Sequence, residues 1–298
     1  MPPFWRAFTP PISDRAIVAV ITDTHGGHRG SLLNPGMTLE LFDQEGNPYH
    51  YHPEPTAVQE FLWGIFTDAI ARIIELANGC PVYVLHLGDL VEGDKHTSEV
   101  MFPDMAAQIQ IGLENLKPLC AIPNVIALRI VIGTEAHEYM FANATRLISA
   151  GLKNAYPELD IQMIQHGYDD IHGVKIDYSH HGPTQSRRQW LRGNEARYYL
   201  RNAMYEDISQ DGYPADVYLR GHVHAPVIEY LQVGKYWSTL VVVPSMKIGG
   251  QYSFKMMRSN PSVTVGMMAI EIEAGRVKQI HDYTVTKDLR TREVFRGR

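Results

Sequence analysis

The chain has 298 residues, of which 45% are hydrophobic and 20% charged, and its formal net charge is −6. This balance is typical of a globular protein with a substantial core, and it disfavours a general affinity for nucleic acid, because the surface would repel phosphate at long range. No apolar run approaches the roughly 20 residues of a membrane span, and residues 1–11 lack the apolar stretch of a signal peptide. We therefore expect a cytoplasmic protein without membrane contact, in which Cys80 and Cys120 are buried thiols.

The first half of the chain alternates strand and helix patterns. A β-branched run at 16–21 predicts a buried strand, and apolar residues at 39–42 and 49–51 predict a hairpin. Thr56 followed by Gln59 is typical of a capping box and predicts the start of a long helix. Further strands are expected at 82–87 and 125–132, and further helices at 103–119 and 138–152.

The second half of the chain favours strands after one more helix. Residues 186–208 predict that helix, which carries several arginines on a charged face. No Pro/Gly/Ser-rich linker and no internal repeat divides the chain, so we predict one α+β domain over residues 1–298. It would contain an insertion hairpin at about 34–55 and C-terminal strands within 226–298. The strands of this half are expected at 161–164, 174–178, 217–219, 227–231, 239–243 and 263–272.

Five short strings rich in acidic residues and histidine each follow an apolar run that predicts a strand. Because strand ends that share an edge of one sheet converge in space, we expect their side chains to lie close together. Carboxylates and imidazoles gathered in this way are typical ligands of metal ions. The strings are Asp23-Thr24-His25, Gly88-Asp89, Gly133-Thr134-Glu135-Ala136-His137, Ser179-His180-His181-Gly182 and Gly221-His222-Val223-His224.

Taken in this order, the strings resemble the motifs of the calcineurin-like metallophosphoesterases, over residues 16 to 225. The resemblance implies a metallophosphoesterase-type β-sandwich of two mixed sheets flanked by helices, with a dinuclear metal site. His180 is preferred to His181 as a ligand, because the family ligand commonly precedes one residue and then Gly or Pro. The resemblance assigns the first ion to Asp23, His25, Asp89 and His224, and the second to Asp89, His180 and His222.

The third string departs from the family pattern. The family has Gly-Asn-His followed by Asp or Glu, and there the Asn oxygen binds the second ion while the His assists the leaving group. This chain has two extra residues and no Asn between Gly133 and His137. Three interpretations stay open: His137 binds the second ion, Thr134 or Glu135 supplies the missing oxygen while His137 keeps the acid role, or the second site is weak. We expect His137 to belong to the site.

The chemistry of such a site follows from charge. Two divalent ions about 3.5–4 Å apart can hold a hydroxide between them and bind a phosphate oxygen. They lower the pKa of the bound water and neutralise the charge that otherwise repels a nucleophile from a phosphate ester. A carboxylate such as Asp89 can bridge two ions, and mixed imidazole and carboxylate ligands suit Mn, Zn, Fe or Ni better than Mg or Ca.

The expected function is hydrolysis of phosphodiester bonds by a hydroxide bound to two metal ions, with Asp89 and His137 as the catalytic residues. Arg187, Arg188 and His181 are candidate contacts to the substrate, since arginine binds phosphate through two parallel hydrogen bonds. A solvated helix face explains the arginines equally well. A DNA or RNA nuclease of the same fold and a non-catalytic metal-binding scaffold are the alternatives. The partner would be a phosphate ester, nucleotides and nucleic acid included, and the sequence indicates neither the natural substrate nor the oligomeric state.

Overall fold

Strands far apart in the sequence assemble into two stacked mixed sheets. The structure, a computed structural model, describes residues 14–94, 99–138, 143–184, 191–249 and 262–290. The first sheet has six strands in the order β13-β12-β1-β4-β5-β6, and its neighbours from β1 to β6 are parallel. Its strands are β1 (Arg15–Ile21), β4 (Val82–His86), β5 (Val125–Val131), β6 (Asp160–Ile164), β12 (Ser262–Glu273) and β13 (Arg276–Asp288).

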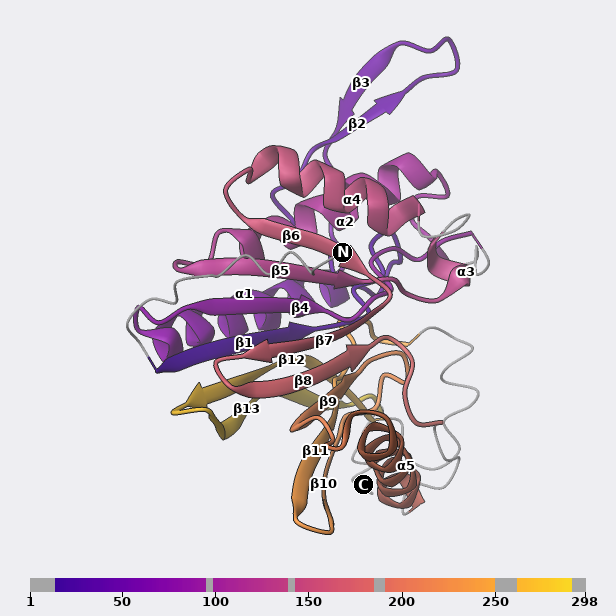
Figure 1. Cartoon of the computed structure of the whole chain (residues 1–298). Coiled ribbons are helices and arrows are strands. Elements are labelled where there is room, and N and C mark those ends of the chain that lie inside the picture. Colours follow the sequence, from indigo (N-terminus) through magenta and orange to yellow (C-terminus); the bar gives the residue numbers. More distant parts are fainter. Residues whose placement is uncertain (1–13, 95–98, 139–142, 185–190, 250–261, 291–298) are drawn as a thin grey trace, which may run out of the picture.

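The second sheet has five strands in the order β10-β11-β9-β8-β7, with β8, β9 and β11 parallel at its centre. A separate hairpin of β2 (Leu39–Phe42) and β3 (Pro48–Tyr51) projects from the rest of the chain (Figure 1). The strands of the second sheet are β7 (His166–Ile171), β8 (Val174–Ser179), β9 (Val217–Arg220), β10 (Val227–Val233) and β11 (Tyr236–Val242).

Successive side chains of a central strand pack alternately into the layers on the two faces of its sheet. On β1, Ile17 and Ala19 belong to the core beneath the helices, whereas Val18 and Val20 belong to the core between the sheets, which also contains Tyr178 of β8. Successive side chains of a strand point to opposite faces, so a strand between two layers needs apolar residues at every position. The uninterrupted apolar run of β1 is explained by this burial on both faces.

Helices cover the outer faces of both sheets, which gives four layers in the order helix, sheet, sheet, helix (Figure 1). A single turn, α3 (Glu135–Glu138), lies between β5 and the next helix. The layer on the six-stranded sheet consists of α1 (Ala57–Ala77), α2 (Met105–Cys120) and α4 (Asn143–Ala155), and α5 (Arg192–Asp211) packs on the five-stranded sheet.

The combination of α and β structure expected from the sequence is confirmed. Thr56 and Gln59 form the expected capping box at the start of α1, and the hairpin of β2 and β3 lies where it was predicted. The expected helix at 186–208 is described from Arg192 and continues to Asp211. β7 and β13 were not predicted, because polar and half-exposed residues interrupt their apolar pattern. No helix in the part of the chain that the structure describes is long and apolar enough to cross a membrane.

Candidate metal centre

The polar strings meet at one end of the sandwich, where strands of both sheets end. β1, β4 and β5 carry three strings in the six-stranded sheet, and β8 and β9 carry two in the five-stranded sheet. Within each sheet, Asp23 N–H donates to Gly88 O at 2.9 Å and Gly221 N–H donates to His180 O at 3.0 Å. Between the sheets, His222 N–H donates to Asp23 Oδ2 at 3.0 Å. The expectation that all strings share the edge of one sheet is therefore wrong, because the centre draws on two sheets.

Five of the expected ligands have a left-handed backbone. In this conformation Cβ crowds the following carbonyl oxygen, which costs an ordinary residue roughly 1–2 kcal/mol. Such strain persists only where the surroundings enforce it, and it gathers at functional sites. The φ angles are 53° at Asp23, 45° at His25, 55° at Asp89, 69° at His222 and 52° at His224. The strain therefore supports a functional role for these loops.

Two glycines allow the strings to approach one another closely. A Cβ at Gly133 would lie 2.2 Å from Asp89 Oδ1, and a Cβ at Gly221 would lie 2.3 Å from Thr22 Oγ1 and 3.0 Å from Asp23 Oδ2. Interiors are packed too densely to absorb such overlaps without movement. A side chain at Gly133 would displace the Asp89 carboxylate, and one at Gly221 would displace the Thr22 hydroxyl and crowd the Asp23 carboxylate.

Asp23, His25 and His224 form the first group of donor atoms. His224 Nε2 lies 3.0 Å from Asp23 Oδ1 and 3.4 Å from His25 Nε2. His25 Nε2 lies 3.7 Å from Asp23 Oδ1 and 3.9 Å from Asp89 Oδ2. Zinc bonds to nitrogen and oxygen are about 2.0–2.2 Å long, so two ligands of one ion lie no more than about 4.4 Å apart. All four separations therefore fit a shared ion.

Asp89, His180 and His222 surround the hydroxyl group of Thr134. Thr134 Oγ1 lies 3.1 Å from His180 Nε2, 3.2 Å from His222 Nδ1 and 3.4 Å from Asp89 Oδ2. Neighbouring ligands at about 2.1 Å from one ion are about 3.0–3.4 Å apart, so these spacings match a coordination shell. Glu135 is exposed and belongs to none of the donor groups found among the described residues. Of the two oxygen donors proposed to replace the asparagine, the geometry thus favours Thr134.

The donor cluster is closed on one side and open on the other. His222 is exposed, and the side chain of His224 is 32% exposed. A substrate would therefore approach from the side of these two imidazoles. The buried members, each at most 2% exposed, are Asp23, His25, Asp89 and His180.

His181 lies on the open side, and its ring centre is 4.5 Å from that of His222. A ring nitrogen of His181 lies within 4.8 Å of ring nitrogens of His180 and His222. The structure therefore brings this candidate substrate contact to the centre. Arg187 and Arg188, the other candidate contacts, lie outside the described residues. His181 is therefore the one candidate substrate contact whose position is known.

The carboxylates of Asp23 and Asp89 are ionised, because neighbouring imidazoles lower their pKa values. Burial raises the pKa of Asp89, but the hydrogen bond and charge of His180 outweigh burial and lower it to about 2. Burial lowers the pKa of His180, but the same contact raises it to about 9. Burial likewise raises the pKa of Asp23, and His224 outweighs it, so this pKa falls well below its ordinary range. Ionised carboxylates in such surroundings attract cations, and protons and metal ions compete for the same imidazoles.

Backbone carbonyl groups determine which imidazole nitrogens face the cluster. His180 Nδ1 donates to Leu87 O at 2.7 Å, and His137 Nδ1 donates to Glu92 O at 2.5 Å. A carbonyl oxygen only accepts, so each neutral ring carries its proton on Nδ1 and presents the lone pair of Nε2. The two Nε2 atoms lie 3.2 Å and 3.8 Å from Asp89 Oδ2. Metal-binding histidines are commonly held this way, so the residues fit divalent transition metals.

Glu92 and Lys247 are functional candidates that the sequence analysis did not identify. Glu92 is 1% exposed, and its Oε2 lies 2.6 Å from Lys247 Nζ and 3.0 Å from His25 Nδ1. The second contact is an ion pair without hydrogen-bond alignment. Burial raises the pKa of Glu92, but His25 and then Lys247 hold it well below its ordinary range. An acidic residue three positions after Asp89 was a usable signal for Glu92, whereas nothing in the sequence marks Lys247.

Comparisons with known proteins do not identify the chain. No family model matches the sequence, and no curated protein matches it. Among solved structures, the protein of unknown function AQ665 from Aquifex aeolicus is 16% identical, with a TM-score of 0.28 over 70% of this chain and 80% of that chain. Thermotoga maritima protein TM1076 is 12% identical, with a TM-score of 0.31 over 92% of this chain and 99% of that chain.

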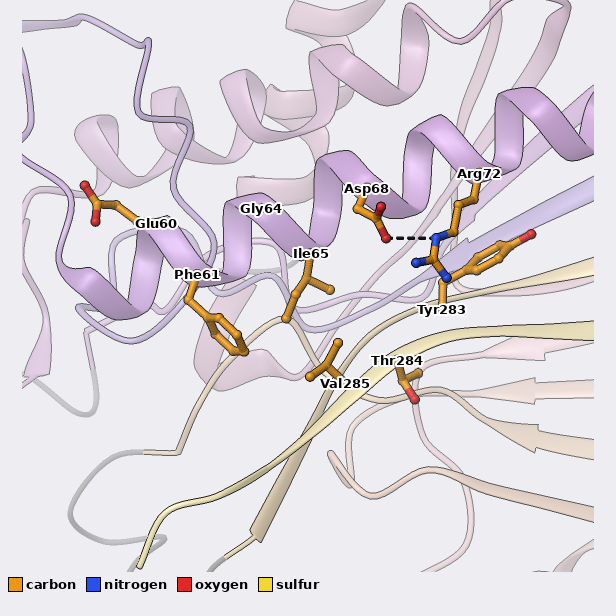
Figure 2. A pocket seen from close by; sticks show the side chains of 9 residues that line it. All are labelled: Glu60, Phe61, Gly64, Ile65, Asp68, Arg72, Tyr283, Thr284 and Val285. Carbon is orange, nitrogen blue, oxygen red and sulfur yellow. Dashed lines mark ion pairs between the residues drawn. The ribbon is translucent and has the colours of Figure 1, made fainter. Parts of the chain in front are cut away.

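Two surface hollows lie apart from the donor cluster. Figure 2 shows the first, of about 410 Å³, where Phe61, Ile65 and Val285 line a groove between α1 and β13 beside the ion pair of Asp68 and Arg72. The second, of about 540 Å³, lies at the start of α1. Neither is lined by a residue of the donor groups.

Proposed function

We propose that this chain is a calcineurin-like metallophosphoesterase that hydrolyses phosphodiester bonds with two divalent metal ions. One observation carries the proposal: six donor side chains from four separate strings meet in overlapping groups. The order of four layers, with two mixed sheets between helices, supports the same family. The six side chains are Asp23, His25, Asp89, His180, His222 and His224.

Asp89 is suited to bridge two ions because its Oδ2 lies between the groups. It is 3.2 Å from His180 Nε2 on one side and 3.9 Å from His25 Nε2 on the other. His180, His222 and the Thr134 hydroxyl would hold the second ion. When bound, the two ions would lower the pKa of a water ligand and neutralise charge on the phosphate group.

Two cations near the centre, among the residues that the structure describes, are already paired, which supports a diester over a monoester. Lys247 is paired with Glu92 at 2.6 Å, and Arg220, beside the last string, lies 2.5 Å from Asp177 Oδ1. Neither of these two described cations is free to bind a phosphate oxygen. A diester carries one negative charge where a monoester carries up to two, so it needs less neutralisation by side chains.

The non-catalytic alternative depended on the missing asparagine of the third string. Thr134 Oγ1 offers an oxygen among the donors of the second group, which removes the main reason for that alternative. The nuclease alternative shares the site and differs in substrate size, so the assay has to include a polynucleotide.

The test compares bis-p-nitrophenyl phosphate, p-nitrophenyl phosphate and single-stranded DNA, using protein stripped by a chelator and reloaded with Mn, Zn, Fe or Ni separately. We expect diester hydrolysis only with added metal, and we expect Asp89→Asn and His222→Ala to lower kcat/KM by at least ~100-fold. Asp282→Asn and His50→Ala change exposed side chains far from the strings in sequence and serve as matched controls. Metal-independent turnover, or normal turnover in both site variants, would refute the proposal, whereas preferred cleavage of DNA would indicate the nuclease.

A further inference from the structure

His137 faces the first donor group, although the family resemblance gives it no ligand role there. Its Nε2 lies 3.8 Å from Asp89 Oδ2, and His25 Nε2 lies 3.9 Å from the same oxygen. The His25 and His137 ring centres are 4.6 Å apart, with the rings at 87°. Donor atoms of the three residues all lie within 4.8 Å of one another. Two imidazole nitrogens thus flank one carboxylate oxygen at nearly equal distances.

Buried contacts hold the turn that carries His137. Glu138 is 1% exposed, and its Oε1 accepts from Gly133 N–H at 2.9 Å and from Thr145 Oγ1 at 2.6 Å. A Cβ at Gly93 would lie 2.3 Å from Ala136 O, so the loop after β4 packs directly on α3. The position of the imidazole is therefore imposed by its surroundings, as preorganised metal ligands require.

Glu92 contacts both imidazoles of this group. His137 Nδ1 donates to the backbone oxygen of Glu92 at 2.5 Å, while the Glu92 carboxylate lies 3.0 Å from His25 Nδ1. Lys247 holds that carboxylate in place at 2.6 Å. The Glu92 carbonyl thus directs Nε2 of His137 toward Asp89, while the Glu92 carboxylate is an ionic partner of His25.

We propose that His137 is a ligand of the first ion, together with His25 and Asp89, the two residues whose donor atoms lie near its own. The inference rests on the proposed function only for the presence of that ion. The separations of 3.7, 3.8 and 3.9 Å around His25 and Asp89 are within the limit of about 4.4 Å for two ligands of one ion. An additional imidazole would make this site richer in nitrogen and favour Zn, Fe, Co or Ni over Mg or Ca.

Titration with Co(II) tests the assignment in four proteins: the wild type, His137→Ala, His222→Ala and the double variant. Because His222 belongs to the second group, each single variant should keep one tightly bound ion and bind the other at least ~10-fold more weakly. The double variant should keep no tightly bound ion. The visible absorption of Co(II), which reports coordination number, should change in His137→Ala and return in part in His137→Gln, whose amide oxygen can bind a metal. His50→Ala is the matched control.

Two results would overturn the assignment, provided that circular dichroism shows folded variants. Unchanged Co(II) affinity and absorption in His137→Ala would exclude a ligand role, and loss of the basic limb of the pH–rate profile would then assign the acid role. A double variant that keeps one tightly bound ion would place His137 on the second ion. The Co(II) titrations need no substrate, although the pH–rate profile does, so a wild type that binds two ions and hydrolyses no ester would refute the proposed function alone.

Discussion

The pair of Lys247 and Glu92 offers a quantitative test of how the centre is held. Their charged atoms are 2.6 Å apart, and the side chains are 12% and 1% exposed. Lys247→Met keeps most of the apolar stem and removes the charge, so Glu92 remains buried with His25 as its one ionic partner among the described residues. Removing one member of a buried ion pair costs about 3–5 kcal/mol, because the other charge is left uncompensated.

We expect the lower end, about 3 kcal/mol, because the lysine is incompletely buried. For a chain of this size the corresponding fall in Tm is about 5 °C. Urea unfolding at pH 7 with chelator present should show a lower midpoint and an unchanged slope. Adding Glu92→Gln to Lys247→Met removes the unpaired charge and should restore about half of the loss.

A loss below about 1 kcal/mol, or a double variant no more stable than Lys247→Met, would contradict this account. The pH dependence gives a second check. Burial raises the pKa of Glu92, but His25 and Lys247 lower it more, so the folded-state pKa is depressed. The stabilisation by the Glu92–Lys247 pair is then complete above about pH 4.3 and is lost as the pH falls. The free energies of unfolding of the wild type and Lys247→Met should therefore converge in acid.

Other substitutions test packing and charge around the strand ends. Gly133→Ala should weaken metal binding at least ~10-fold, because the new Cβ would meet Asp89 Oδ1 at 2.2 Å. Gly64→Ala in α1, where no atom lies within 4 Å of the new Cβ, should instead stabilise the protein by about 0.5–1 kcal/mol. Burial raises the pKa of Asp177, but His166 and Arg220 lower it more. Asp177→Asn should therefore lower the free energy of unfolding at pH 7 and match the wild type as the pH falls below about 4. Zinc or manganese at a hundred times Kd should raise the free energy of unfolding by about 2.7 kcal/mol, and chelator should reverse this.

Equilibrium dialysis measures the metal affinity of Gly133→Ala, and urea unfolding measures the stabilities of Gly64→Ala and Asp177→Asn. Thermal unfolding with and without metal measures the stabilisation by metal. Wild-type metal affinity in Gly133→Ala would mean that the close approach to Asp89 is unimportant. A deficit of Asp177→Asn that persists unchanged in acid would mean that its charge is not what stabilises the fold. A Tm insensitive to every divalent ion would argue against a metal centre.

Burial explains which elements could be predicted. The strands β1 and β4 lie between two apolar layers, so their sequences are apolar at almost every position and predict strands directly. β13 lies at the edge of its sheet, where half-exposed and polar side chains weaken the alternation on which strand prediction depends. The start of α1 was predictable because Thr56 and Gln59 complete a capping box within four consecutive residues.

The types and order of the donor side chains could be predicted because metal chemistry restricts ligands to a few residue types, which remain visible at strand ends. Their assembly from two sheets could not, since pairing between distant strands leaves no local trace. Thr134 was distinguished from Glu135 by contacts to residues 45 to 88 positions away. Lys247 meets Glu92 across 155 positions of sequence. Such contacts depend on how the layers stack, so only the folded chain could reveal them.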